Sequence, residues 1–81
     1  MRLARTPHFL RAYHGAPLNI QRAFDKKAAL LLLNLHHPSL RAKKYDESTR
    51  LWQARVNNDW RFYFAIESDM YVLHEIKRHP K

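Results

Sequence analysis

Hydrophobic and polar residues alternate through the last third of the chain, which predicts two neighbouring β-strands. The segments Trp52–Val56 and Trp60–Ile66 follow this pattern, and the turn-forming residues Asn57–Asp59 separate them. An antiparallel hairpin with this loop forms apolar pairs on one face: Val56 with Trp60, Ala54 with Phe62, and Trp52 with Phe64. The other face pairs Gln53 with Tyr63 and Arg55 with Arg61. Because facing arginines repel each other, this face calls for a carboxylate or a bound phosphate.

A third strand is predicted over Met70–Lys77, after the turn residues Glu67–Asp69. Matching the apolar faces gives a register with these pairs: Phe64 with Val72, Phe62 with His74, and Tyr63 with Leu73. The same register places Glu75 opposite Arg61. Arg61 then has a carboxylate partner, in an ion pair worth about 0.5 kcal/mol if it is exposed. Arg55 has no counterion in this register.

The first half of the chain predicts two helices in a hairpin. Thr6–Pro7 is a typical helix start, with threonine as N-cap and proline at the first helical position, and it predicts a short helix over about Pro7–His14. Pro17 opens a second helix, in which one face recurs at spacings of three and four: Ile20, Phe24, Lys27 or Ala28, Leu31 and Leu35. This helix should end near His36–Pro38, because proline cannot continue it.

The remaining segments complete one α+β domain that spans residues 1–81. Met1–Arg5 is long enough only for an edge strand, and Ser39–Asp46 reads as a strand or extended edge. The predicted fold is an N-terminal helical hairpin packed on one face of a twisted, mainly antiparallel sheet of about four strands.

The chain carries a strong positive charge, which indicates the kind of partner that it binds. The chain has fifteen Lys and Arg residues and seven Asp and Glu residues, which give a net charge of +8. A folded basic domain implies a polyanionic partner, and aromatic residues among the basic ones favour nucleic acid. The longest uncharged apolar run, Ala28–Leu33, is far shorter than the roughly 20 residues that cross a bilayer. We expect no membrane span.

Neither cysteine nor histidine predicts a metal site. The chain has no cysteine, so thiolate ligands and disulfides are excluded. The adjacent His36 and His37 point apart, and no His-x-x-x-His helix accompanies His74 or His79. We expect no metal and no other cofactor.

Four segments, in this order, resemble the RelE/ParE superfamily of bacterial type II toxin–antitoxin toxins: His37–Tyr45, Trp52–Val56, Trp60–Phe64 and Val72–His79. The resemblance covers nearly the whole chain. It implies the fold given above, a cytoplasmic location, and a cognate antitoxin that is typically acidic, with oligomers of the two proteins left open. The apolar excess of Leu30–Leu33 either packs on the sheet or accepts an antitoxin segment.

Two activities share this fold, so the resemblance alone does not assign the chemistry. RelE-like members cleave mRNA in the ribosomal A site without metal, whereas ParE-like members inhibit DNA gyrase. Basic side chains on an open sheet suit RNA cleavage, in which a 2′-hydroxyl attacks the adjacent phosphate and translation is inhibited. The alternatives are a gyrase inhibitor and a non-catalytic basic module that binds nucleic acid or the ribosome.

The resemblance implies a set of site residues. Arg61 is the phosphate-binding or acid residue, Arg55 and Lys44 flank the scissile phosphate, and His79 is the acid or base. Only one of the adjacent residues Lys43 and Lys44 can face Arg55 on a strand, and the spacing in the family that the chain resembles favours Lys44. Further substrate contacts are expected from Arg41, Lys43, Gln53, Tyr63, Lys77 and Arg78. Tyr63 shares the arginine face and should supply the base contact that a tail tyrosine makes in ribonuclease members.

Overall fold

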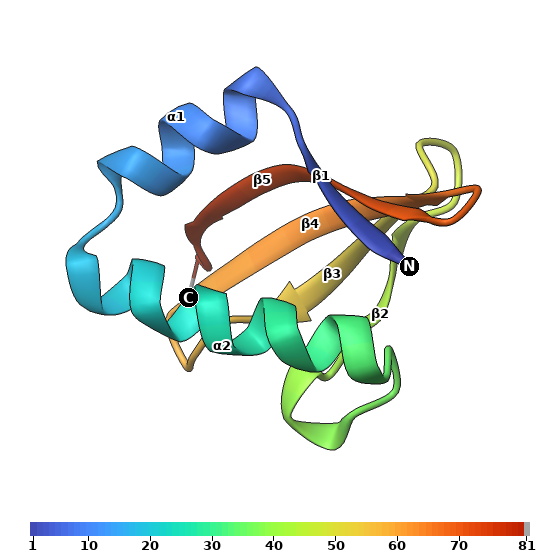
Figure 1. Ribbon diagram of the computed structural model, residues 1–81. Helices are drawn as coiled ribbons and strands as arrows, with labels where there is room; N and C mark the ends of the chain where they lie inside the picture. The colour runs from blue at the N-terminus through green and yellow to red at the C-terminus, as the bar shows by residue number, and fades with distance from the viewer. Residues whose placement is uncertain (81) are drawn as a thin grey trace.

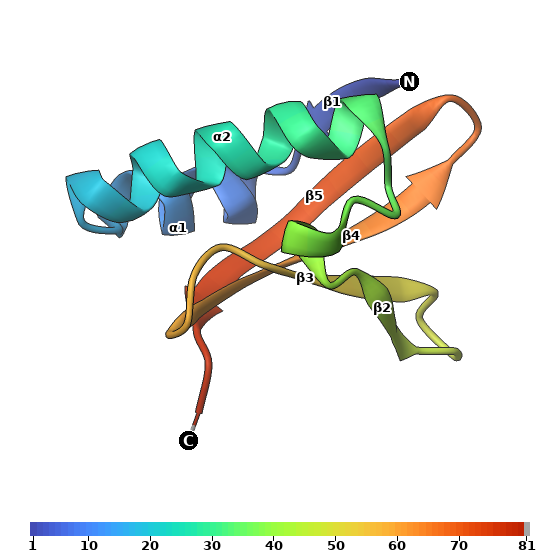
Figure 2. The same ribbon diagram turned by 90° about the horizontal axis from the view of Figure 1, so that it is seen from below.

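Within residues 1–80, which the computed structural model describes, two helices lie on one side of a five-stranded sheet (Figure 1). The elements are β1 (Arg2–Arg5), α1 (Pro7–Gly15), α2 (Leu18–Leu33), the short 3₁₀ helix η1 (Pro38–Leu40), β2 (Lys43–Asp46), β3 (Leu51–Arg55), β4 (Trp60–Glu67) and β5 (Met70–Arg78). The strand order is β1-β5-β4-β3-β2. Figure 2 shows both helices above the sheet and the opposite face open. The predicted α+β fold is confirmed, while Lys81 of the predicted domain lies outside the described residues.

The fifth strand is β1, at the edge of the sheet. It runs parallel to β5, whereas every other pair of neighbouring strands in the described chain is antiparallel. Thr6 ties its end to β5, since its backbone N–H and its hydroxyl both donate to the Leu73 carbonyl, at 3.2 and 3.0 Å. The sheet is therefore one strand larger than the predicted four, and Met1–Arg5 is the edge strand that the sequence indicated.

Helix α1 begins as the sequence predicts. Thr6 is the N-cap, its hydroxyl accepts a hydrogen bond from the Phe9 N–H at 3.1 Å, and Pro7 occupies the first turn. Helix α2 ends at Leu33, a few residues before the predicted end. The side chain of Asn34 explains this difference, because its Oδ1 accepts from the His36 N–H at 2.9 Å and so competes with a further helical turn.

The core lies between the helices and the covered face of the sheet. The side chains that α2 buries follow its predicted apolar stripe: Ile20, Phe24, Ala28 and Leu31. Phe24 meets the fully buried Phe62 of β4 edge to face, with ring centroids 5.0 Å apart. This packing supports the sheet from the helix side. The backbone positions of residues that point to the other face are therefore set by the core. Among the described residues, no helix has the length and apolar character needed to cross a membrane.

The β3–β4 hairpin has the predicted register. Its Cα partners are Trp52 with Phe64, Gln53 with Tyr63, Ala54 with Phe62, and Arg55 with Arg61. Asn57 closes the loop, because its Oδ1 accepts hydrogen bonds from the backbone N–H groups of Asp59 and Trp60, at 2.8 and 2.9 Å. Alternation and turn chemistry agree here, and the facing arginines are confirmed.

The predicted β4–β5 register is wrong. The observed partners are Arg61 with Lys77, Phe62 with Ile76, Tyr63 with Glu75, Phe64 with Leu73, and Ala65 with Val72. A bulge at His74 causes the change: the buried residues of β5 are Tyr71, Leu73 and Ile76, and the last two are three positions apart. Strict alternation cannot bury both Leu73 and Ile76 on one face, so the extra residue is required.

The segment Ser39–Asp46 is a strand only in its second half. Pro38–Leu40 forms a 3₁₀ turn, and Arg41 follows it in the left-handed region with φ of 47°. The strand β2 then pairs Lys43 with Gln53 and Lys44 with Trp52. A second irregularity follows directly, between Lys44 and Asp46.

Candidate functional site

The open face of the sheet carries two rows of side chains that cross the strands. One row joins the partners Arg55, Arg61 and Lys77 of β3, β4 and β5. The next row joins Lys43, Gln53, Tyr63 and Glu75. Because strand residues two apart share a face, both rows lie on the side away from the helices. The sheet therefore presents a line of cations to solvent.

These rows border a hollow of about 210 Å³. Its lining residues are Arg41, Lys43, Gln53, Ala54, Arg55, Arg61 and His79. Six of these seven are among the ten site residues that the sequence predicts, and none is acidic. A hollow with four permanent cations and an imidazole is suited to an anion such as a phosphate group.

Arg61 is held in place by the hairpin loop. Its Nη1 donates to the backbone carbonyls of Asn57, at 2.7 Å, and Trp60, at 3.0 Å. The remaining N–H groups of the guanidinium stay available for a ligand. The predicted ion pair of Arg61 with Glu75 is wrong, since the Glu75 carboxylate lies 2.6 Å from His8 Nε2 of α1. Within the described chain, neither Arg55 nor Arg61 has a carboxylate within salt-bridge distance.

His79 reaches the hollow because the backbone after β5 is anchored. Its N–H donates to the Asp59 carbonyl at 2.7 Å, which fixes the residue beside the β3–β4 loop. The side chain is exposed and lines the hollow together with Arg61. Imidazole is the side-chain group that exchanges protons near neutral pH, so the hollow combines cations with a proton-transfer group.

The preference for Lys44 over Lys43 does not agree with the side of the sheet on which each lysine lies. Lys43 is the partner of Gln53 and lines the hollow, whereas Lys44 is the partner of Trp52 and belongs to the row on the helix side. Lys44 Nζ lies 4.0 Å from Glu47 Oε1, in an exposed ion pair. The period of two along β2 lets only one of the lysines face Arg55, and that residue is Lys43.

Gln53 and Tyr63 are buried side chains on the same sheet face as the hollow. They are only 6% and 4% exposed, and Gln53 Nε2 donates to the Tyr63 hydroxyl at 3.0 Å. Lys77 Nζ sits 5.3 Å from the centroid of the Tyr63 ring. Since this ring is covered, the expectation that Tyr63 stacks on a base does not fit its burial. Arg78 is the partner of Trp60, in the row on the helix side, and does not line the hollow.

Tyr45 is an aromatic residue that the sequence reasoning missed. Its side chain is 55% exposed, and its ring meets Tyr63 at nearly a right angle, with centroids 5.0 Å apart. Tyr45 lies two residues after Lys43 on β2, so it shares the open face with Gln53 and Tyr63. The sequence reasoning missed it because the preference for Lys44 places Tyr45 on the other face. An exposed ring on a rigid support beside a cationic hollow is suited to stacking on a nucleic-acid base.

A metal site is not formed by the described residues. Among residues 1–80, no group of three or more His, Asp or Glu side chains is close enough to hold an ion.

Comparison with known proteins identifies the fold of the chain. No protein-family model matches the chain, and no curated protein matches it. Among solved structures, the YoeB/ParE toxin from Agrobacterium tumefaciens has a TM-score of 0.80 and 10% identity, over 99% of this chain and 100% of that one. The archaeal RelE–RelB complex from Pyrococcus horikoshii gives a TM-score of 0.77 and 16% identity, over 95% and 92%. The RelBE2 toxin–antitoxin complex from Mycobacterium tuberculosis gives 0.76 and 17% identity, over 96% of each chain.

The chain has the RelE/ParE toxin fold. The matched lengths show that this fold accounts for nearly the whole chain. The low identities show that most side chains differ from those of these structures. The RelE/ParE fold therefore fixes the open sheet face, and the chemistry of that face depends on this chain's own residues.

Proposed function

We propose that this protein is the toxin of a type II toxin–antitoxin pair and a metal-independent endoribonuclease that cleaves mRNA on the ribosome. The observation that carries the proposal is the hollow on the open sheet face, where Arg41, Lys43, Arg55, Arg61 and His79 converge and none of the described lining residues is acidic. The RelE/ParE fold supports it, because two of the similar structures are described as a toxin and as a toxin–antitoxin complex.

The proposed reaction uses only groups of the RNA and of this chain. The 2′-oxygen of one nucleotide attacks the adjacent phosphorus as its proton passes to a base, and the bond from phosphorus to the 5′-oxygen breaks as that oxygen takes up a proton. The products are a 2′,3′-cyclic phosphate and a free 5′-hydroxyl, with no net change in protons. Arg55, Arg61 and Lys43 neutralise the negative charge that builds up on the phosphoryl oxygens. His79 transfers the proton, either from the 2′-oxygen or to the leaving 5′-oxygen.

The RNA is expected to enter as a single strand. A duplex would bury the bases, whereas an unpaired codon can place one base on an exposed aromatic ring. Tyr45, two residues after the hollow-lining Lys43 on β2, provides such a ring. A strand presented by the ribosome meets these requirements, and the site of action is then the cytoplasm.

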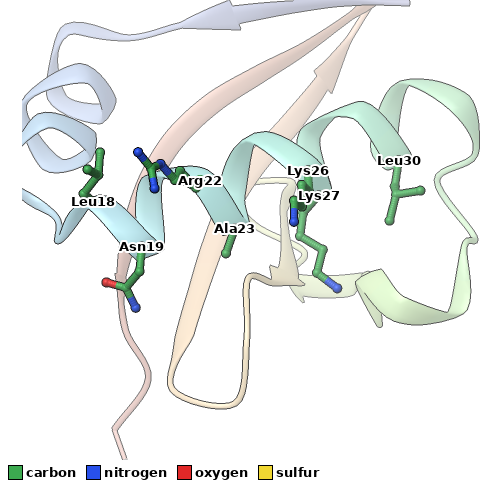
Figure 3. Close-up of a pocket in the computed structure, with 7 residues that line it drawn as sticks. All are labelled: Leu18, Asn19, Arg22, Ala23, Lys26, Lys27 and Leu30. Carbon is green, nitrogen blue, oxygen red and sulfur yellow. The ribbon is translucent and has the colours of Figure 1, made fainter.

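The partner is expected to be an acidic antitoxin that binds along α2. A groove of about 520 Å³, the α2 groove, lies on this helix. Figure 3 shows the side chains that line it: Leu18, Asn19, Arg22, Ala23, Lys26, Lys27 and Leu30. Leu33, which is 82% exposed, extends the apolar surface at the end of the helix. Apolar residues flanked by three cations fit an amphipathic segment with acidic side chains. Two of the similar solved structures are complexes of a RelE protein with its RelB partner or of the RelBE2 pair.

A comparison of the two neighbouring lysines tests the proposal. We expect induced expression of the wild-type chain in bacteria to arrest growth and to produce new 5′ ends within translated codons. Lys43→Ala should lower the cleavage rate by about 10²-fold, the usual effect of losing one donor to a developing charge. Lys44→Ala is the matched control, because it removes the same charge from the other face of β2 and should leave cleavage nearly unchanged.

Other outcomes would contradict the nuclease proposal. Arrested cells with intact transcripts and inhibited DNA supercoiling would indicate a gyrase inhibitor instead. Equal loss of cleavage in the Lys43 and Lys44 variants would show that net charge, and not the hollow, determines activity.

A further inference from the structure

A second cationic groove lies beside the hollow, between α2, η1 and the β3–β4 loop. It has a volume of about 510 Å³ and is lined by Lys27, Pro38, Ser39, Arg41, Arg55, Val56, Asn57 and Asn58. Arg41 and Arg55 line both the groove and the hollow, so the two are contiguous. The groove adds Lys27 to these cations, and none of its lining residues is acidic.

Lys27 differs from an ordinary surface lysine. Its side chain is half-buried on α2, and its Nζ donates to the Ser39 carbonyl at 3.2 Å, which holds the ammonium group at the groove. Burial and the nearby charge of Arg55 lower the pKa of Lys27. In the described chain no carboxylate pairs with Lys27. Among residues 1–80, the fold therefore keeps the like charges of Lys27 and Arg55 close together without a carboxylate partner.

Arg41 is held in an unusual backbone conformation between the two sites. Its φ of 47° lies in the left-handed region that non-glycine residues rarely adopt, and its N–H donates to the Pro38 carbonyl at 3.3 Å. The side chain is exposed and borders both sites. A cation in this position can contact two successive phosphates of one strand.

We propose that the groove with Lys27, Arg41 and Arg55, called the phosphate groove below, is a second phosphate subsite. It binds the phosphodiester next to the one in the hollow. This inference rests on the proposed RNA-cleaving function and adds the path of the strand: from the open sheet face, past Arg55, towards α2. A bound phosphate supplies the counterion that Lys27 and Arg55 lack within the described chain. The side-chain amide groups of Asn57 and Asn58 provide further hydrogen-bond donors at the groove.

The test compares short RNAs that differ by one phosphate. Dinucleotides contain one phosphodiester and trinucleotides contain two; 2′-O-methyl sugars prevent cleavage in both. Their binding to the wild-type protein, to Lys27→Gln and to Lys26→Gln is measured by NMR titration at several salt concentrations. Glutamine keeps a donor for the Ser39 carbonyl but removes the charge. Lys26 is the matched control, because it lines the α2 groove and not the phosphate groove.

We expect Lys27→Gln to weaken trinucleotide binding about five-fold, as for the loss of one charge-assisted phosphate contact. The magnitude of the salt slope for the trinucleotide should fall by about 0.7, the value for one phosphate of a single strand. Dinucleotide binding should change much less, because the hollow alone accommodates its phosphate. Lys26→Gln should leave the difference between the two RNAs as in the wild type.

Two different results would overturn the inference. If the wild-type protein binds RNA and both lysine variants weaken it equally, the effect is one of diffuse charge and only the second subsite is wrong. If the wild-type protein binds neither the short RNAs nor an mRNA on the ribosome, the proposed function fails together with the subsite.

Discussion

At the scale of single residues, the site depends on cations that are positioned by the backbone. Two carbonyl groups of the hairpin loop hold one guanidinium nitrogen of Arg61, and the Asp59 carbonyl anchors the backbone of His79. Such positioning matters because a donor stabilises a developing charge only when it is already oriented towards it. The facing arginines are therefore explained better by a bound anion than by a neighbouring carboxylate.

Tyr45 gives a prediction at this scale. Replacing it with alanine should weaken single-stranded RNA binding by about 1–3 kcal/mol, which is the usual effect of losing one stacked base. The stability of the fold should change little, because more than half of the side chain is exposed. Titration of RNA against the protein, followed by fluorescence anisotropy, measures the loss.

The control for this prediction is Tyr45→Phe, which keeps the ring and should keep the affinity. An alanine variant that binds RNA as well as the wild type would show that Tyr45 does not stack on a base.

At the scale of elements, the sequence predicts those parts in which two local signals agree. The β3–β4 register follows from alternation together with the Asn57 turn, and the start of α1 follows from Thr6 and the proline after it. The β4–β5 register could not be predicted, because the bulge at His74 is stabilised by the burial of Leu73 and Ile76 in the assembled core. The face of Tyr45 was missed for another reason: it follows from alternation along β2 only once Lys43, and not Lys44, is known to be the partner of Gln53.

These limits had different consequences for the site. The cluster of Arg55 with Arg61 was predictable, since both lie in the well-defined hairpin. The choice between Lys43 and Lys44 was not, because the face of a short edge strand depends on its register against β3. The role of Lys27 could not be predicted either, since its position beside Arg55 depends on how α2 packs on the sheet.

The hairpin loop provides a prediction at the element scale. Asn57→Ala removes the acceptor of two backbone hydrogen bonds and should lower the free energy of unfolding by about 1–2 kcal/mol. Since the Asn57 carbonyl also holds Arg61, a loosened loop should reduce RNA cleavage as well. Urea unfolding and single-turnover cleavage rates measure the two effects.

Asn57→Asp keeps an oxygen acceptor at the same position, so its stability should stay close to that of the wild type. If the alanine variant is as stable as the wild type, the loop is held by other interactions and Asn57 does not determine the hairpin.

At the scale of the whole molecule, the two layers separate two kinds of contact. The helices cover one face of the sheet and present the α2 groove with apolar and basic residues (Figure 3). The other face presents the cationic hollow, and the phosphate groove lies at the border between them. Lys27 lines both the α2 groove and the phosphate groove, so an acidic partner on α2 and an RNA strand would compete for one cation. The net charge of +8 favours both polyanions.

The most direct test of the central claim is the cleavage of a defined mRNA bound to purified ribosomes. Two messages are compared, one with ribose throughout and one with a single 2′-deoxynucleotide at the cleaved position. The account predicts that only the all-ribose message is cut, and that its new 3′ end carries a 2′,3′-cyclic phosphate. Cleavage of the deoxy-substituted message at the same position would contradict the attack by the 2′-oxygen and with it the assigned chemistry.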